Sequence, residues 1–456
     1  MTKVNFVILA AGKGTRMRSA IPKVLHKVSG RSMLGHVVAA VESLGKAKKI
    51  IVTGHGAEQV EQQFKSPTTI FTQQKEQLGT GHAVQMAIPA LCSDAVVIVL
   101  YGDVPLIRPS TIEKILDVVT ETTMGLLTIN LENPQGYGRI VRNGQQEITE
   151  IIEQKDASVE QLKITEVNTG VLALRSTQLR EWLPKITNNN AQGEYYLTDL
   201  VAIAWAEGVE VISVNPESAT EVEGVNNRIQ LSQLERAHQR QLAEVLMESG
   251  TSLADPARFD QRGELNAGTD NFIDINCVFN GSVTIGSNVS IGANCQISDS
   301  IIGDGVSILP NTIIESSVVG DRAVIGPFAR LRPGTELGSD TKVGNFVETK
   351  KAVVGKGSKI NHLSYVGDAQ LGENVNIGAG TITCNYDGVS KHKTDLGDGV
   401  FVGSNSTLVA PIKVDKGGFV AAGSTVTSEV PSDSLAVGRA KQRNIKGWKR
   451  PTKKEV

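Results

Sequence analysis

The sequence has few cysteines, few aromatic residues and no long apolar run. Its four cysteines are scattered without a C-x-x-C pair, which argues against a disulfide framework or a zinc site and predicts reduced thiols in a cytoplasmic protein. Lys and Arg total 46 against 48 Asp and Glu, so the excess of positive charge expected of a nucleic-acid-coating protein is missing. No stretch approaches the ~20 apolar residues that span a bilayer. We therefore expect small-molecule chemistry, with no nucleic-acid partner and no membrane insertion.

The first half of the chain alternates short apolar runs with amphipathic stretches. The 456 residues are too many for one ordinary core and predict two or three domains. Runs such as FVILAAG (6–12) and AVVIVLYGD (95–103) end in turn residues, and stretches such as SMLGHVVAAVESLG (32–45) follow them. This alternation predicts an α/β domain with a mainly parallel sheet and ligands at the carboxyl ends of its strands.

From about residue 283 the pattern changes to a six-residue beat of aliphatic residues. A hexapeptide period is typical of a β-helix solenoid, in which the aliphatic side chain points inward and a small following residue lets the chain turn. From Thr383 to Leu396 the step is 13 residues instead of 12, so TCNYDGVSKHKTD should leave the coils as a loop. The aliphatic residues on the beat are Ile285, Ile291, Ile297, Ile302, Ile308, Ile314, Val319, Ile325, Leu331, Leu337, Val343, Val354, Ile360, Val366, Leu371, Ile377, Leu396, Val402, Leu408, Val414, Val420 and Val426.

A helix is predicted between the two halves, over residues 227–250. Leu231, Leu234, Leu242, Val245 and Leu246 have helical spacing, and a glycine at 250 is a natural stop. Such a helix is either a rigid spacer between domains or an element packed on the first domain.

The glycine-rich stretch LAAGKGTRMRSAIPK (9–23) follows the first apolar run. It is neither a Walker loop nor a dinucleotide fingerprint, because Val7 and Met17 stand where those motifs need glycine. Gly12 and Gly14 can still bring backbone N–H groups close to phosphate oxygens, and Arg16 supplies positive charge. The alternative is an ordinary strand-to-helix turn with solvated basic residues.

Two further stretches of the first half carry candidate ligand groups. Asp103 follows a buried-looking strand, where a single carboxylate beside phosphates suits Mg²⁺, although a helix cap or turn former is an equal alternative. QLGTGHA (77–83) is a second glycine-rich loop, suited to base or ribose contacts.

Taken together, LAAGKGTRM…PK, EQLGTGHA and YGDVPL resemble the nucleotide-sugar pyrophosphorylase family. With NNNAQGEYYLTD, VEGVNNR and the hexapeptide region, the whole chain resembles the bacterial bifunctional N-acetylglucosamine-1-phosphate uridylyltransferase/glucosamine-1-phosphate acetyltransferases. The resemblance implies a Rossmann-like nucleotidyltransferase domain at 1–228, a linker helix at 229–249 and a left-handed parallel β-helix at 250–456. It also implies Mg²⁺, the substrates UTP, acetyl-CoA and glucosamine-1-phosphate, and a homotrimer formed through the β-helix.

For the first domain, the resemblance implies a nucleotide and sugar pocket beside a metal. Arg16 and Lys23 should contact phosphates and neutralise charge, while Asp103 and Asn226 should hold Mg²⁺. The residues expected to line the pocket are Leu9, Ala10, Ala11, Gly12, Lys23, Gln74, Gly79, Thr80, Tyr101, Gly102, Asp103, Gly138, Glu153, Asn168 and Asn226.

In the second half, polar residues are embedded in the repeats. His362 is a candidate base because its unperturbed pKa of ~6.5 lets it accept a proton near neutral pH, although an exposed surface histidine is the alternative. The resemblance implies that His362 deprotonates the glucosamine amine as it attacks the thioester of acetyl-CoA. It assigns Arg332, Lys350, Tyr365 and Asn376 to the amino-sugar phosphate. The acetyl donor is expected on Ala379, Asn385, Tyr386, Ser404, Ala422 and Arg439, with Cys384 a bystander and Arg439 at the start of a basic C-terminal tail.

Two other readings of the sequence stay open at this point. One is a monofunctional sugar nucleotidyltransferase whose β-helix only trimerises, against which His362 and the CNYDG loop speak. The other is a non-enzymatic sensor or scaffold that keeps a nucleotide-binding fold, against which Asp103, Arg16 and Lys23 speak.

Overall fold

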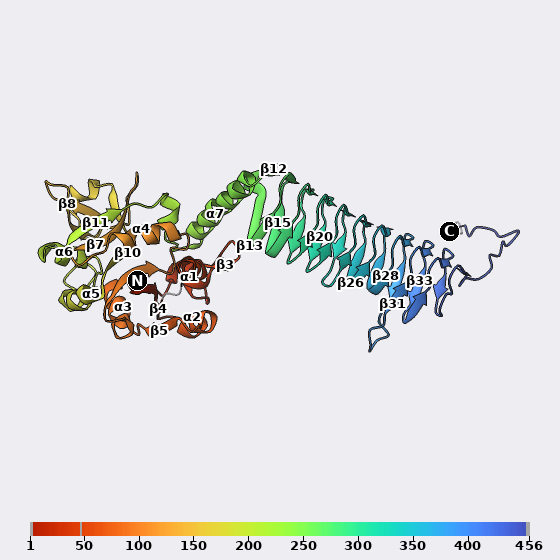
Figure 1. The fold of residues 1–456 in the computed structure, drawn as a ribbon, viewed down its shortest axis with the longest axis horizontal. Coiled ribbons are helices and arrows are strands. Elements are labelled where there is room, and N and C mark those ends of the chain that lie inside the picture. Colours follow the sequence, from red (N-terminus) through yellow and green to blue (C-terminus); the bar gives the residue numbers. More distant parts are fainter. Residues whose placement is uncertain (1–2, 46–47, 453–456) are drawn as a thin grey trace. The chain divides into compact units, whose positions relative to one another are not determined.

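The computed structural model describes residues 3–45 and 48–452, which form two compact units (Figure 1). The units divide between His238 and Gln239, inside the long helix α7 (Arg228–Glu248). No helix in the described ranges is long and apolar enough to cross a membrane.

The first unit is built around one twisted sheet. Its strand order is β11-β7-β10-β6-β1-β4-β5, and all neighbours are parallel except β10, which is antiparallel to β6 and to β7. The expectation of a mainly parallel sheet is confirmed. The strands are β1 (Lys3–Ala10), β4 (Lys48–Thr53), β5 (Thr69–Gln73), β6 (Ala95–Tyr101), β7 (Thr123–Asn130), β10 (Glu166–Arg175) and β11 (Glu210–Val214), with the hairpin β8 (Arg139–Arg142) and β9 (Ile148–Ile152) attached through β10.

Helices cover both faces of this sheet. Alternate residues of β1 enter two separate apolar clusters, Val7 and Leu9 on one face and Phe6 and Ile8 on the other, so the strand is buried on both sides. The first cluster includes residues of α3 (Thr80–Ala87), α5 (Ser176–Trp182) and α6 (Asp199–Ala206), and the second includes residues of α1 (Met33–Ser43), α2 (Ala57–Phe64) and α4 (Pro109–Asp117). With both faces covered, the ends of the strands remain as the place for a ligand.

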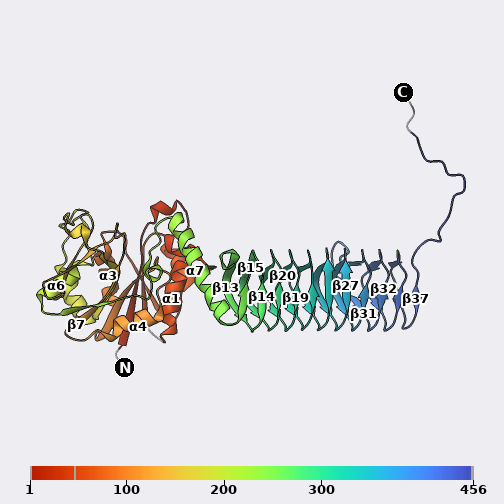
Figure 2. The ribbon, with the colours of Figure 1, turned by 90° about the horizontal axis from the view of Figure 1, so that it is seen from above.

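The second unit is a solenoid of stacked coils with three faces, seen side-on in Figure 2. One face runs β12 (Thr251–Leu253), β14 (Asn271–Ile273), β16 (Ser290–Ile291), β19 (Ser307–Ile308), β22 (Val324–Ile325), β25 (Lys342–Asn345), β27 (Lys359–His362), β29 (Asn376–Ile377), β32 (Phe401–Val402), β35 (Phe419–Val420) and β37 (Leu435–Ala436). The second face has β17 (Gln296–Ser298), β20 (Ile313–Glu315), β23 (Arg330–Leu331), β30 (Ile382–Cys384), β33 (Thr407–Val409) and β36 (Thr425–Val426). The third has β18 (Ile301–Ile302), β21 (Val318–Val319), β24 (Glu336–Leu337), β31 (Thr394–Leu396) and β34 (Ile412–Val414).

Four longer strands join the second and third faces. They are β13 (Phe259–Ala267), β15 (Cys277–Ile285), β26 (Glu348–Val354) and β28 (Tyr365–Leu371), and the two ends of β15 pair with β17 and β18 respectively. On all three faces, strands of neighbouring coils pair in parallel, about 4.8 Å apart.

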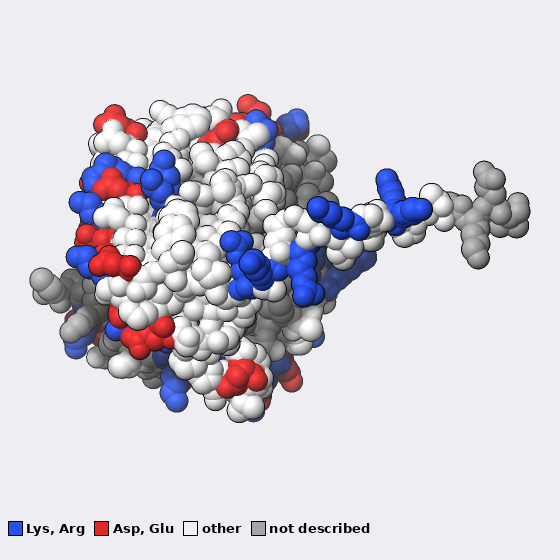
Figure 3. Space-filling model, turned by 90° about the vertical axis from the view of Figure 1, so that its right-hand side faces the viewer, with Lys and Arg blue, Asp and Glu red and all other residues white. Residues whose placement is uncertain are grey.

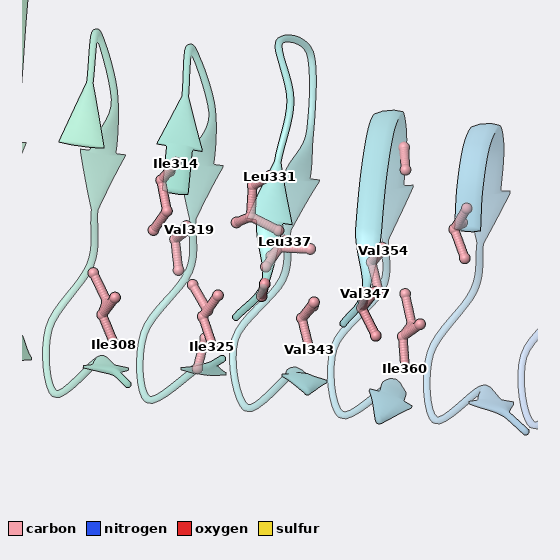
Figure 4. Close-up of a cluster of buried hydrophobic side chains, with 14 of the residues drawn as sticks. Ile308, Ile314, Val319, Ile325, Leu331, Leu337, Val343, Val347, Val354 and Ile360 are labelled. Carbon is pink, nitrogen blue, oxygen red and sulfur yellow. The ribbon is translucent and has the colours of Figure 1, made fainter. Parts of the chain in front are cut away.

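The aliphatic residues on the six-residue beat fill the interior of the solenoid. Every one of them is buried in a single apolar cluster, and the residues labelled in Figure 4 point inward from successive coils. The predicted loop is also confirmed: after β30 the chain leaves the coils and returns at β31 (Figure 1). The four cysteines are free thiols, as expected.

The predicted helix between the halves is confirmed, because α7 runs from Arg228 to Glu248 and Gly250 has a left-handed φ of +103°. Leu234 is buried against the first unit, while Leu246 is buried in the core of the solenoid. Val245 does not belong to the buried stripe: its side chain is 65% exposed. The two ends of α7 each pack on their own unit, so no single apolar stripe runs along the helix.

Candidate functional sites

The first site lies where β1 and β6 end, side by side. The N–H of Gly102 donates to the carbonyl of Leu9 (2.9 Å), which continues the pairing of these strands past the end of β6. The N–H of Val225 donates to the carbonyl of Asp103 (3.0 Å), and this bond brings the distant segment around residue 226 to the same place.

Four predicted side chains meet at this point. Lys23 Nζ forms an ion pair with Asp103 Oδ2 and also donates to Asn226 Oδ1 (3.3 Å), while Arg16 donates to the same Asn226 oxygen (3.0 Å). Gly14, with φ +59°, makes this possible, since a Cβ at that position would lie 2.7 Å from Cβ of Lys23. Two cations therefore face one carboxylate and one amide oxygen.

A cavity of about 220 Å³ opens beside this cluster. Of the predicted pocket residues, those that line it are Leu9, Ala10, Ala11, Gly12, Lys23, Gln74, Gly79, Thr80, Tyr101 and Asp103, and they are joined by Val24, Gln77, Ala83 and Glu194. The other predicted residues, which are not among those lining it, are Arg16, Gly102, Gly138, Glu153, Asn168 and Asn226.

One wall of the cavity depends on Gly79, at the start of α3. Its backbone (φ 116°, ψ 173°) is open to glycine alone, and a Cβ there would lie 2.5 Å from the carbonyl oxygen of Tyr195. Around it, Gly81 N–H donates to Tyr195 O (2.8 Å) and Tyr195 N–H donates to Leu78 O (2.8 Å). The side chain of Gln74, almost fully buried, donates to Gly79 O (3.0 Å), so the lining residues of this wall hold one another.

Gly138, Glu153 and Asn168 gather a short way from the cavity. Asn168 N–H donates to Gly138 O (2.9 Å), and a Cβ on Gly138 would lie 3.5 Å from Glu153 Oε1. Burial raises the pKa of the Glu153 carboxyl, with the nearby Asp156 and other carboxylates adding to the effect and a hydrogen bond from Thr198 opposing it.

Tyr101 links this group to the cavity. Its ring packs on Gly170, where a Cβ would lie 2.6 Å from the ring. Burial, then the charges of Asp103 and Glu153, raise the pKa of its hydroxyl above the ordinary value. The phenol therefore stays protonated at neutral pH.

In the solenoid, His362 ends β27 on the first face. Its Nδ1 lies 2.8 Å from Oδ1 of Asn345, the residue in register with it on the previous coil. The imidazole is exposed, so a ligand can reach it.

A second group of predicted residues lies on β23, β26 and β28. Arg332, one residue beyond β23, donates to Glu348 Oε1 (2.7 Å), and Glu348 is in register with Tyr365. Lys350 is in register with Gly367, over which the Tyr365 hydroxyl lies so closely that a Cβ on Gly367 would overlap it. This arrangement presents two cations and a phenol from three successive coils.

Three of the residues expected at the acetyl donor follow one another along a corner of the solenoid. Gly380 N–H donates to His362 O (3.2 Å), Asn405 N–H donates to Ala379 O (2.7 Å) and Gly423 N–H donates to Ser404 O (2.8 Å). Ala422 precedes Gly423, so His362, Ala379, Ser404 and Ala422 occupy successive coils. We call these four residues the corner column.

Asn385 and Tyr386 lie at the start of the inserted loop. Asn385 is buried, and its amide donates to Asp368 Oδ2. Tyr386 is exposed, with Lys391 Nζ 4.5 Å from the centre of its ring. Asp387 accepts from His392 Nε2 (2.6 Å) and from two backbone N–H groups of the loop, and these bonds hold the pKa of its carboxyl below the ordinary value.

Asn376 and Arg439 are less closely joined to the rest. Asn376 begins β29 in register with Lys359, at the opposite end of the strands from His362. In the described part of the chain, no hydrogen bond or ion pair connects Asn376 to Arg332, Lys350 or Tyr365. Arg439 is exposed just after β37, with its Cδ 3.9 Å from the position of a Cβ on Gly423.

Three family models match parts of the chain. Residues 6–142 match the MobA-like NTP transferase domain, residues 263–345 the GMPPB C-terminal domain, and residues 394–428 the hexapeptide repeat of succinyl-transferase. Among solved structures, UDP-glucose pyrophosphorylase with UDP-glucose is similar over 53% of this chain and all of its own, with 17% identity and a TM-score of 0.44.

Curated relatives cover almost the whole chain. The bifunctional protein GlmU of Marinobacter nauticus is 59% identical over 453 residues, which cover 99% of this chain and all of the relative. That of Cellvibrio japonicus is 54% identical over 451 residues, with coverage of 99% and 100%. This chain belongs to the GlmU family. It is accordingly a bifunctional enzyme, a uridylyltransferase and a glucosamine-1-phosphate acetyltransferase, which confirms the resemblance and sets aside both the monofunctional and the non-enzymatic reading.

The sequence analysis did not identify several residues that lie at the two sites. Glu194 and Gln77 line the cavity, and Glu348 pairs with Arg332. Asn345 could have been found, because it precedes His362 by the 17 residues that separate many successive coils. For Glu194 the sequence offers no comparable signal, since its place in the cavity depends on a contact between segments more than 100 residues apart.

Proposed function

We propose that residues 1–228 transfer UMP from UTP to N-acetylglucosamine-1-phosphate, that residues 250–456 acetylate glucosamine-1-phosphate, and that the helix at 229–249 links the two domains. The observation that carries the first assignment is the convergence of Arg16, Lys23, Asp103 and Asn226 beside the cavity at the ends of β1 and β6. A cluster of cations at the carboxyl ends of parallel strands suits a nucleoside triphosphate.

Mg²⁺ fits the oxygen pair at this site. Asp103 offers a carboxylate and Asn226 an amide oxygen, which are hard ligands, and both already face a cation, the Lys23 ammonium. The described residues contain no group of three or more His, Cys, Asp or Glu side chains that could hold a metal. A pair of oxygens suits an ion that keeps several waters and shares phosphate oxygens. When bound, Mg²⁺ would neutralise phosphate charge and orient the triphosphate.

The uridylyl transfer is an in-line displacement at phosphorus. An oxygen of the sugar-1-phosphate attacks the α-phosphorus of UTP, the P–O bond to the pyrophosphate breaks, and pyrophosphate leaves with that bond's electrons. The attacking oxygen is already an anion, so the chain needs no strong general base. Arg16 and Lys23 neutralise the charge that collects on the phosphates.

Different parts of the cavity are proposed to hold different parts of the nucleotide. We assign the uracil to Gln74, Gly79 and Thr80, the phosphates to the loop from Leu9 to Gly12, and the nucleotide or sugar to Tyr101 and Gly102. The N-acetylglucosamine ring is assigned to Gly138, Glu153 and Asn168, which lie together next to Tyr101. Tyr101, held in its phenol form, can donate a hydrogen bond there.

In the acetyltransferase domain, His362 is the proposed base. As the amine nitrogen of glucosamine-1-phosphate attacks the thioester carbonyl, its proton passes to Nε2 of His362, the C–S bond breaks and coenzyme A leaves as the thiolate. No covalent acyl-enzyme is needed. Arg332, Lys350, Tyr365 and Asn376 are assigned to the sugar phosphate, for which the two cations supply the complementary charge.

The corner column supports the position of the acetyl donor. From His362 to Ala422 it covers three coil steps, about 14 Å at ~4.8 Å per step, a length suited to the extended thiol-bearing arm of acetyl-CoA. Asn385 and Tyr386, in the loop that follows β30, are also assigned to the donor. Beyond it, basic side chains gather on the tail after β37, as Figure 3 shows, and Arg439 at its start is assigned to the phosphates of the donor.

We also propose that the β-helix forms a homotrimer. Phe328, Phe346 and Leu363 follow one another on a corner next to His362, with φ of +56°, +56° and +50° and exposures of 51%, 56% and 63%. The two phenyl rings stack with centroids 5.4 Å apart. Bulky residues in this conformation are strained, and an exposed apolar ladder of this kind suits burial against further copies of the chain. We place the enzyme in the cytoplasm, where UTP and acetyl-CoA are made.

The experiment that tests this function measures release of the coenzyme A thiol from acetyl-CoA and glucosamine-1-phosphate, without UTP. Wild type should release thiol, and a folded, trimeric His362→Ala variant should lose most of that activity, by about 10²- to 10⁴-fold for a general base. Both proteins should make UDP-N-acetylglucosamine equally well from UTP and N-acetylglucosamine-1-phosphate. Unchanged thiol release in His362→Ala would refute the role of this histidine.

A further inference from the structure

We infer that Asn345 is a positioning residue that orients His362 and fixes its tautomer. This inference rests on the proposed role of His362 as the base. Asn345 belongs to the coil before the one that carries His362, and its side-chain oxygen faces Nδ1 at 2.8 Å.

The backbone around this pair differs from the rest of the face. On the first face, β22 and β29 are each two residues long, whereas β25 and β27 extend for four residues and end at Asn345 and His362. The extra length places these two residues in register. Gly344 permits it, because a Cβ at that position would overlap the carbonyl of Asn361 on the next coil.

The contact decides which ring nitrogen carries the proton. A carbonyl-type oxygen accepts hydrogen bonds and cannot donate them, so Nδ1 is the protonated nitrogen and Nε2 keeps its lone pair. Nε2 is then free to receive the amine proton. An amide, unlike a carboxylate, holds the ring without adding a charge that would stabilise the imidazolium.

The neighbouring charged and hydroxyl groups lie elsewhere or are engaged by other partners, so the orienting role falls to Asn345. The charged residues on the same two strands, Lys342 and Lys359, are at the opposite ends of β25 and β27. Across the corner, Glu348 is engaged by Arg332. Ser364, two residues after His362, donates to the backbone oxygen of His362 (2.8 Å) and supports its backbone rather than its ring.

The test compares Asn345→Ala and Asn345→Asp with wild type and with the neighbouring control Asn361→Ala. In Asn345→Ala we expect kcat for acetylation to fall about 10- to 100-fold, the cost of losing a group that orients a catalytic side chain, with the KM values for both substrates within about threefold. In Asn345→Asp, which keeps the size of the side chain, a carboxylate beside the ring should move the acid limb of the pH profile of kcat/KM up by about one pH unit. Asn361→Ala should behave as wild type.

Each outcome separates this inference from the proposed function. A fall in kcat together with a shifted acid limb supports it. An Asn345→Ala enzyme within twofold of wild type, or an Asn345→Asp enzyme with an unmoved acid limb, overturns it while leaving His362 as the base. Unchanged turnover by His362→Ala would remove the base itself, and the inference with it. Uridylyltransferase activity, measured on every variant, and trimer mass confirm that each protein is intact.

Discussion

Replacing Gly79 by alanine should weaken the binding of UTP and leave acetylation by the same protein unchanged. The new Cβ would lie 2.5 Å from Tyr195 O and 2.7 Å from Tyr195 N, so the segment around residue 79 must separate from the segment around residue 195. Two backbone hydrogen bonds that join these segments would be lost or lengthened. The cavity wall formed by Gln74, Gly79 and Thr80 would open as a result.

The magnitude follows from the separate contributions. A side chain in a backbone conformation reserved for glycine costs ~1–2 kcal/mol. Each of the two hydrogen bonds contributes ~0.5–1.5 kcal/mol. A total of about 3 kcal/mol, if binding must restore the wall, corresponds to a roughly 100-fold rise in the KM for UTP.

The assay is a UTP titration of pyrophosphate release, with acetyltransferase activity of the same protein as the internal control. Gly208→Ala is the matched variant, because Gly208 also has positive φ (+74°) but a Cβ there would meet nothing within 4 Å. We expect Gly208→Ala to keep the wild-type KM. If Gly79→Ala also stays within threefold of it, the wall is not part of the UTP site and the reasoning fails.

Three further outcomes are expected. Asp103→Asn should lower kcat/KM for uridylyl transfer by at least about 10³-fold, because the carboxylate is the proposed metal ligand and faces Lys23, and should leave acetylation unchanged; paired assays of one preparation check this, and a joint loss would contradict it. Arg332→Ala should raise the KM for glucosamine-1-phosphate about tenfold or more, whereas Arg322→Ala, which removes a surface ion pair with Asp340, should not, as initial rates at varied sugar phosphate will show. Burial, then the charge of Asp156, raises the pKa of Asp199 to about 6, so the native state binds more protons than the unfolded state between pH ~4 and 6 and its stability falls as pH rises through that window. Asp199→Asn should therefore gain stability relative to wild type on going from pH 4 to pH 7 in urea denaturation, and a constant difference would refute the assignment.

The parts of the molecule with a short repeat could be predicted from the sequence, and the parts that depend on distant contacts could not. Each aliphatic residue on the six-residue beat is buried, because one residue in every six points inward and this spacing is visible within a short stretch of sequence. Helical spacing predicted the helix α7 but not which of its residues are covered: Val245 fits the spacing and is exposed. The approach of Asn226 to Arg16, 210 residues away, arises only when β6 is paired with β1, and it was expected from the family resemblance alone.

The pairing of Asn345 with His362 lies between these cases. The coil step of 17 residues is visible in the sequence, but the lengthening of β25 and β27 that brings the two side chains level is not. A periodic pattern determines which residues stack. Small departures from it, such as the longer strands β25 and β27, determine which polar side chains come close enough to act together.

With the acetyl donor proposed to lie along the corner column, the spacing of the coils sets the distance between its two ends. Because every coil adds one strand spacing, the distance from His362 to any later residue of the column can change only in steps of about 4.8 Å. Removing one whole coil between Ala379 and Ala422 would keep the pattern of neighbouring contacts, since each coil touches only the next. The shortened enzyme would then favour a donor with a shorter arm. The number of coils would therefore set the length of acyl donor that the enzyme accepts.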